Sequence, residues 1–160
     1  MQAPPIIVAR PKQADSVLTG STKRRVLAMV VAIGAATLLG LAAYLEPSPT
    51  GLGTHTQLAM PTCGWIVTMD LPCPTCGMTT AFAYAANGNL LRSAGAQPLG
   101  AVLALLTAMT LLVAGYVVVT GSVIGSAFAG LWSGRVAWIL AVVATAAWAY
   151  KVLAYKGLLG

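Results

Sequence analysis

Three long apolar runs limit the folds that this chain can adopt. They cover residues 26–45, 99–119 and 136–155, and each is close to the roughly 20 helical residues that cross the hydrocarbon core of a bilayer. In an open chain only helices satisfy every backbone polar group in lipid. The sequence therefore predicts an all-α integral membrane protein in which these runs are the three transmembrane helices.

The composition favours this class over a soluble domain. The chain of 160 residues is 58% hydrophobic and 8% charged, with a mean hydropathy of +0.84, whereas soluble domains are about 25% charged. A cleaved signal peptide is the alternative for the first run. It would have a shorter apolar core and a small-residue cleavage site, which Ala42-Ala43-Tyr44-Leu45-Glu46 matches poorly. We therefore expect a retained helix.

Positive charge is concentrated before the first apolar run. The net charge is +6, and five of the nine Lys and Arg residues lie in the first 25 positions. Such a cluster marks the cytoplasmic side of a first span and favours anionic lipid. We expect residues 1–25 to form a basic cytoplasmic tail and the bilayer to be the partner. Nucleic acid is not expected, because no basic stripe is interleaved with aromatic residues.

The segments between the runs predict two loops and a short helix. A Cys-containing extracytoplasmic loop covers 46–78, a short interfacial or re-entrant helix covers 79–91, and a Gly-rich loop covers 120–135. An alternative makes 76–91 a fourth span, which fits the positive-inside rule better. Against it, the segment is weakly apolar and ends in the turn-like Asn87-Gly88-Asn89. Both topologies place the cysteines at the extracytoplasmic side of the cell membrane.

The residues able to do chemistry are gathered in the first of these loops. Cys63, Cys73 and Cys76 are the only cysteines, and His55 is the only histidine. The last two cysteines form a Cys-Pro-Thr-Cys motif followed by Gly77 and a predicted short helix. We therefore expect Cys76 to lie near a helix N-terminus, where the helix dipole lowers the pKa of a thiol.

Three uses of this cluster remain open. With His55, the cysteines form a Cys3His set, for which zinc is the expected metal in a structural site. An extracytoplasmic location also permits disulfide chemistry between Cys73 and Cys76, or between either and Cys63. The third possibility is that the cysteines are small buried residues and His55 is a polar loop residue. The CxxC pattern favours the metal site.

The stretch from Cys63 to Pro98 resembles a bacterial family of small membrane proteins that carries a CPxCGxTR motif between apolar helices and is classed as a domain of unknown function. The motif arginine is replaced here by Thr80. The resemblance implies that the three cysteines act as one unit, and it implies no activity. The matching positions outside the cysteines are Pro74, Gly77, Thr79, Gly88 and Pro98.

Most catalytic classes lack the residues that they need. Only Asp15, Glu46 and Asp70 are acidic, so no carboxylate pair for acid–base catalysis is evident. No phosphate-binding glycine loop is present. Thiol–disulfide exchange is the one catalytic class that the residues allow. A third kind of function, a structural subunit of a membrane complex or a homo-oligomer, follows from small residues at helical spacing, such as Ala32, Ala36 and Gly40.

Overall fold

The computed structural model describes residues 11–122 and 134–157. Within these ranges every regular element is a helix, and no strand occurs. The all-helical class expected from the apolar runs is therefore confirmed. Three of the helices in the described part of the chain are long: α1 (Pro11–Tyr44), α5 (Pro98–Thr120) and α7 (Gly134–Tyr155). Four shorter ones lie between α1 and α5 in the chain: η1 (Thr54–Leu58), α2 (Gly64–Met69), α3 (Met78–Ala86) and α4 (Leu90–Ala96).

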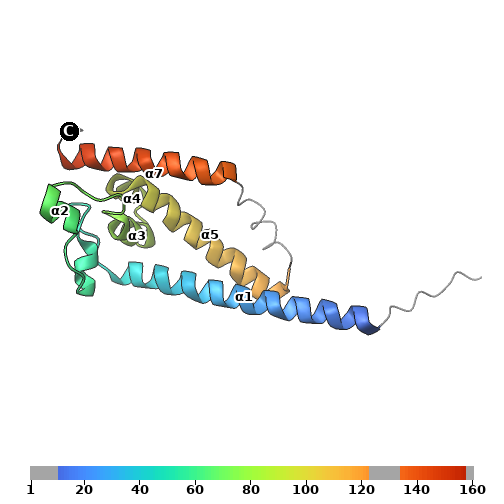
Figure 1. Ribbon diagram of the computed structural model, residues 1–160. Coiled ribbons are helices and arrows are strands. Elements are labelled where there is room, and N and C mark those ends of the chain that lie inside the picture. Colours follow the sequence, from blue (N-terminus) through green and yellow to red (C-terminus); the bar gives the residue numbers. More distant parts are fainter. Residues whose placement is uncertain (1–10, 123–133, 158–160) are drawn as a thin grey trace, which may run out of the picture.

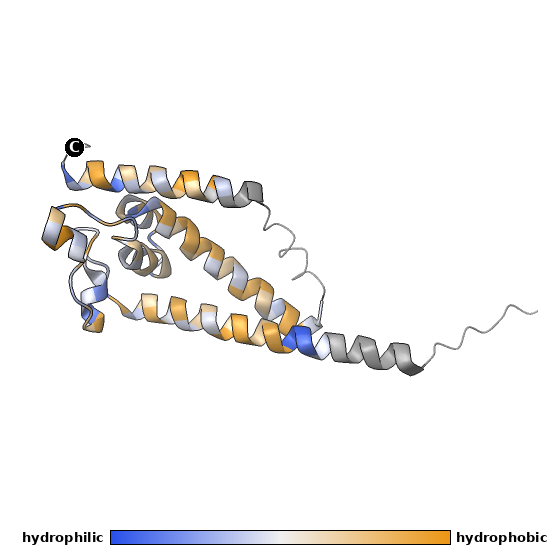
Figure 2. Cartoon of the chain, in the orientation of Figure 1, coloured by the Kyte–Doolittle hydropathy of each residue, from blue (hydrophilic) through white to orange (hydrophobic). Residues whose placement is uncertain are grey.

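The short helices are gathered at one end of the long ones. Figure 1 shows α1 and α7 on opposite sides, α5 running obliquely between them, and η1, α2, α3 and α4 at the end where α1 finishes and α5 begins. α5 packs along α1, and α3 packs against α1, α4 and α5. The loop with the cysteines is therefore held at the end of the molecule opposite Lys23, Arg24 and Arg25, which form the blue band on α1 in Figure 2.

Among the described residues, two helices are long and apolar enough to cross a membrane. They are Ser21–Tyr44, with 24 residues, and Pro98–Thr120, with 23. Only 17% of the most apolar part of each is buried inside the molecule, so most of their apolar side chains face outward. In α7 the apolar stretch within the described range is Ala141–Tyr155, which is shorter than a full span. The third span therefore stays a prediction.

The predicted short helix at 79–91 is in fact part of a helical hairpin. α3 ends at Ala86 and α4 begins at Leu90, and Gly88 between them has a φ of 78°, in the left-handed region. The side chain of Asn89 caps α4 by accepting a hydrogen bond from the backbone N–H of Arg92 at 3.2 Å. The turn expected at 87–89 therefore separates two helices instead of ending one.

Small buried residues let this hairpin pack closely on α5. The hydroxyl of Ser93 in α4 donates to the carbonyl oxygen of Ala81 in α3 at 2.7 Å. A Cβ built on Gly100 of α5 would lie 2.8 Å from the Cβ of Ala81, so only glycine fits there. Pro98 occupies the first turn of α5, where its missing N–H costs nothing.

Candidate metal centre

Two separate segments supply the three cysteines. Cys63 is the residue before α2, and its carbonyl oxygen accepts hydrogen bonds from the backbone N–H groups of Ile66 and Val67. Cys73 and Cys76 lie in a tight turn just before α3, closed by a 3.0 Å bond from the Cys76 N–H to the Cys73 carbonyl. The turn and the α2 helix therefore bring thiols ten positions apart in the sequence to one place.

The three sulfur atoms are close enough to share one ion. All three Sγ atoms lie within 4.8 Å of one another, and those of Cys73 and Cys76 are 2.9 Å apart. All three thiols are free. Thiolates bound to one tetrahedral zinc at about 2.3 Å would lie about 3.8 Å apart. The observed spacing therefore fits a metal after small side-chain adjustments.

The thiol environments differ in a way that the sequence did not indicate. Burial, with the neighbouring thiols of Cys73 and Cys63, raises the pKa of Cys76 to about 12. The expected lowering by a helix N-terminus is therefore wrong for the metal-free thiol. At Cys63 burial also acts to raise the pKa, but hydrogen bonds from Cys76 and from the backbone of α2 outweigh it and lower the pKa to about 7.

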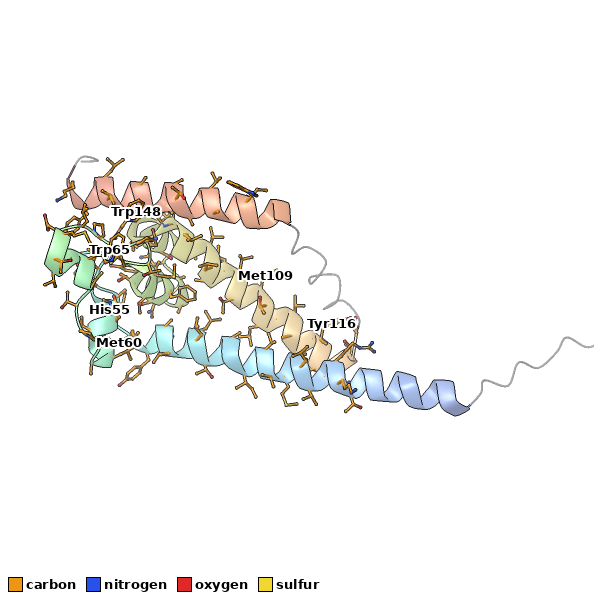
Figure 3. All side chains as sticks on the ribbon, in the orientation of Figure 1. His55, Met60, Trp65, Met109, Tyr116 and Trp148 are labelled. Carbon is orange, nitrogen blue, oxygen red and sulfur yellow. The ribbon has the colours of Figure 1, made fainter. Side chains whose placement is uncertain are left out.

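His55 lies outside this cluster. It is part of η1, and its Nε2 lies 3.2 Å from the carbonyl oxygen of Pro61. Figure 3 shows His55 and Met60 near η1, away from Trp148. Within the described ranges no histidine or carboxylate joins the three thiols. The structure therefore brings together three of the four predicted ligands.

Two side chains from the long helices hold the loop around the cysteines. The indole N–H of Trp148 in α7 donates to the carbonyl oxygen of Pro72 at 3.0 Å (Figure 3). The side-chain amide of Gln97, at the start of α5, donates to the carbonyl oxygen of Pro74 at 3.0 Å. Gln97 is fully buried, and its Oε1 has no hydrogen-bond partner in the part of the chain that the structure describes. These contacts fix the backbone on both sides of Cys73.

Lys151 is a functional candidate that sequence reasoning missed. It is only 5% exposed, and its Nζ donates to the carbonyl oxygens of Ala96 at 2.7 Å and of Gly51 at 3.1 Å. The sequence contained one signal for this residue. A single lysine inside the apolar run 136–155 is energetically unfavourable in a membrane, so such a residue usually has a functional role.

The position of Lys151 also explains Gly77. This glycine precedes α3 with a φ of 88°. A Cβ there would lie 2.8 Å from the carbonyl oxygen of Gly51, 3.0 Å from that of Ala96 and 3.0 Å from Nζ of Lys151. Both the backbone conformation and the space therefore require glycine at this motif position.

Thr80, which replaces the motif arginine, is buried inside the molecule. Only 1% of it is exposed, and its hydroxyl lies 2.8 Å from that of Thr54 in η1. The neighbouring Thr79 is half-buried. Position 80 therefore joins α3 to η1 and does not face the solvent.

A polar contact links the same loop to the end of α7. The carboxylate of Asp70 accepts hydrogen bonds from Lys156 and from the hydroxyl of Tyr155, each at 2.9 Å. The hydrogen bond from Lys156, and then that from Tyr155, lowers the pKa of Asp70. The loop is therefore fastened to α7 at Asp70 as well as at Pro72.

The geometry defines an all-helical protein with candidate membrane helices and a three-thiol cluster that could bind a metal. A model of a family described as "Protein of unknown function (DUF2752)" matches residues 63–111. The match begins at Cys63 and contains all three cysteines, the α3–α4 hairpin and part of α5. No curated protein and no solved structure matches the chain. The similarity therefore supports the cluster and hairpin as one unit and supplies no activity.

Proposed function

We propose that this chain is a multi-pass membrane protein whose three-thiol cluster binds a structural zinc ion on the extracytoplasmic side. The observation that carries the proposal is the convergence of all three Sγ atoms within 4.8 Å. A disulfide needs only two of them, whereas a metal uses all three. The ion would join the start of α2 to the turn before α3 and so fix the loop against the helices.

The exposed apolar surface supports the membrane placement. Large side chains along α1 and α5, such as Ile33, Leu112 and Val119, are 61%, 68% and 78% exposed. A core helix of a soluble protein would bury such residues. Lipid would cover them here, with α7 as the third span.

The distribution of charge supports the orientation. The Cys-containing loop follows the end of the apolar span Ser21–Tyr44 of α1, and the group Lys23, Arg24 and Arg25 lies at its start (Figure 2). By the positive-inside rule the basic end is cytoplasmic, which places the thiols outside. The α3–α4 hairpin then enters the outer part of the membrane as a re-entrant element beside α5. We also propose that the protein is bacterial and that Cys73–Thr79 corresponds to the CPxCGxT part of the family motif. A membrane-protein partner or a second copy of the chain would pack on the exposed helix faces.

The metal shell needs a fourth donor. Three thiolates leave one position of a tetrahedron open, which water or an external ligand can fill. His55 would complete a Cys3His shell only if η1 moved and its contact with Pro61 were lost. A closed shell with His55 and an open shell without it make different predictions for a His55 variant.

The test is metal analysis of the full chain purified in mild detergent. We expect close to one zinc per chain, lost in the Cys76→Ser variant and also in Cys63→Ser. His55→Ala is the matched variant: it retains zinc if the shell is open and loses it if His55 is a ligand. A folded, metal-free preparation that has intact thiols and does not take up zinc on titration would overturn the metal function.

One observation favours a second function, thiol–disulfide exchange. The sulfur atoms of Cys73 and Cys76 are 2.9 Å apart, so little movement is needed to bond them. In that reaction the two thiols would give up two protons and two electrons to the disulfide of a partner protein, which would become two thiols. Labelling intact cells with a membrane-impermeant thiol reagent, with and without reductant and chelator, separates the two functions. Reductant-dependent labelling indicates exchange, and chelator-dependent labelling indicates metal.

A further inference from the structure

A cavity of about 540 Å³ lies beside the cysteine loop, between the segment 49–52, the α3–α4 hairpin and the end of α7. Its wall includes Arg92 from α4 and Lys151 from α7, with Tyr84, Thr50 and Tyr155 around them. None of the three cysteines lines it. The cavity is therefore separate from the candidate metal centre.

The cavity wall has two positive charges and no negative one. No aspartate or glutamate lines it, and the one ion pair between side chains in the described ranges joins Lys156 to Asp70. Neither Arg92 nor Lys151 is therefore paired with a carboxylate in the part of the chain that the structure describes. A cation as deeply buried as Lys151 is costly without a balancing negative charge.

Both cations keep hydrogen-bond donors that the described residues do not use. An ammonium group has three N–H donors, and Lys151 uses two of them on the carbonyl oxygens of Gly51 and Ala96. The side chain of Arg92 makes no hydrogen bond within the described ranges, and the residue is exposed at the cavity wall. The hydroxyls of Tyr84 and Tyr155 are already bound to Ser48 and Asp70. A ligand would therefore be held mainly by the two cations.

We propose that this cavity binds a phosphate group. A guanidinium fork and an ammonium group are the usual pair of phosphate donors, because the fork binds two oxygens and the ammonium binds as a point charge. The thiolates of a metal centre can balance part of the charge on Lys151, but they leave Arg92 without a counter-charge. The phosphate is either that of a lipid head group, since the cavity lies at the end of the apolar helices, or a free phosphate ester.

The test measures binding to the full chain in a neutral detergent with two probes. Inorganic phosphate reports the free anion, and dihexanoyl phosphatidylglycerol reports the lipid head group; sodium chloride at equal ionic strength is the control. We expect one or both probes to bind, as measured by calorimetry and by a rise in the unfolding temperature. Binding of the lipid alone assigns the site to a head group, and binding of inorganic phosphate assigns it to the free anion.

Matched variants separate the cavity from general electrostatic attraction. Arg92→Gln should weaken binding by about tenfold or more, the usual effect of losing a charged hydrogen-bond partner. Lys156→Gln removes a nearby positive charge outside the cavity and should leave binding unchanged. Arg92→Gln is the main variant because Arg92 is exposed, so its loss should not prevent folding as loss of the buried Lys151 could. The proposal is overturned if neither probe binds, if Arg92→Gln binds as the native chain does, or if both variants weaken binding equally.

Discussion

The hydroxyl oxygens of Thr54 and Thr80 lie 2.8 Å apart in the interior of the protein, and each residue is 1% exposed. The Thr54 hydroxyl also accepts a hydrogen bond from the backbone N–H of Ser48 at 3.0 Å. Thr80 belongs to α3 and Thr54 to η1, so this pair holds the loop before the cysteines against the hairpin after them.

We expect Thr80→Val to destabilise the protein by about 1–3 kcal/mol, because it leaves the buried Thr54 hydroxyl without that partner. Thr80→Ser keeps the hydroxyl and should lose less. The measurement is the free energy of unfolding in detergent. In a double-mutant cycle with Thr54→Val, the double variant should lose less free energy of unfolding than the sum of the two single losses. Additive losses would show that the hydroxyls are not coupled.

Gly77→Ala should be among the most destabilising small substitutions. It adds a Cβ that would meet the backbone oxygens of Gly51 and Ala96 at 2.8 and 3.0 Å, in a residue with a φ of 88°. We expect a loss of at least about 2 kcal/mol from strain and overlap together. Gly88→Ala is the matched control, since it also has positive φ but open space around its Cβ. Equal losses of unfolding free energy at the two positions would mean that the close approach at Gly77 does not contribute to the destabilisation.

Trp148→Phe should loosen the cysteine loop while leaving α7 in place. It removes the donor to the Pro72 carbonyl, at a cost of about 0.5–1.5 kcal/mol. Because Pro72 is next to Cys73, the thiol of Cys73 should react faster with a maleimide in the metal-free protein. Trp138→Phe is the control on the same helix, with a side chain 75% exposed. If both variants leave the labelling rate unchanged, Trp148 does not position the loop.

Acid should release the contact between Asp70 and the end of α7. The pKa of Asp70 is lowered from its ordinary value of 3.8 by Lys156 and Tyr155. A carboxyl whose folded pKa is depressed stabilises the protein fully above its unfolded pKa, and that contribution is lost as the pH falls through the folded pKa. The unfolding temperatures of the native chain and Asp70→Asn should therefore differ at pH 6, and the difference should shrink as the pH falls below 3.8. A constant difference across this range would show that the carboxylate charge is not involved.

Local sequence patterns were enough for the helical class and for much of the site. The apolar runs at 26–45 and 99–119 lie in α1 and α5, apart from Leu45, because their length and hydropathy are properties of the segment itself. The Asn87-Gly88-Asn89 turn also has a local cause, since Gly88 takes a left-handed conformation and Asn89 caps α4. These patterns did not predict the second short helix, α4. Leu90–Ala96 is stabilised by contacts with α3, such as the hydrogen bond from the Ser93 hydroxyl to the Ala81 carbonyl oxygen.

The sequence by itself determined that helices would form and that Cys63, Cys73 and Cys76 belong to one short region. Only the tertiary structure decided that their sulfur atoms converge without His55. It also decided that burial raises the pKa of Cys76 to about 12, against the effect expected from a helix N-terminus. The contacts of Lys151 with Gly51 and of Trp148 with Pro72 span 100 and 76 residues. No local pattern encodes contacts of this range, because they depend on how α7 packs back onto the loop.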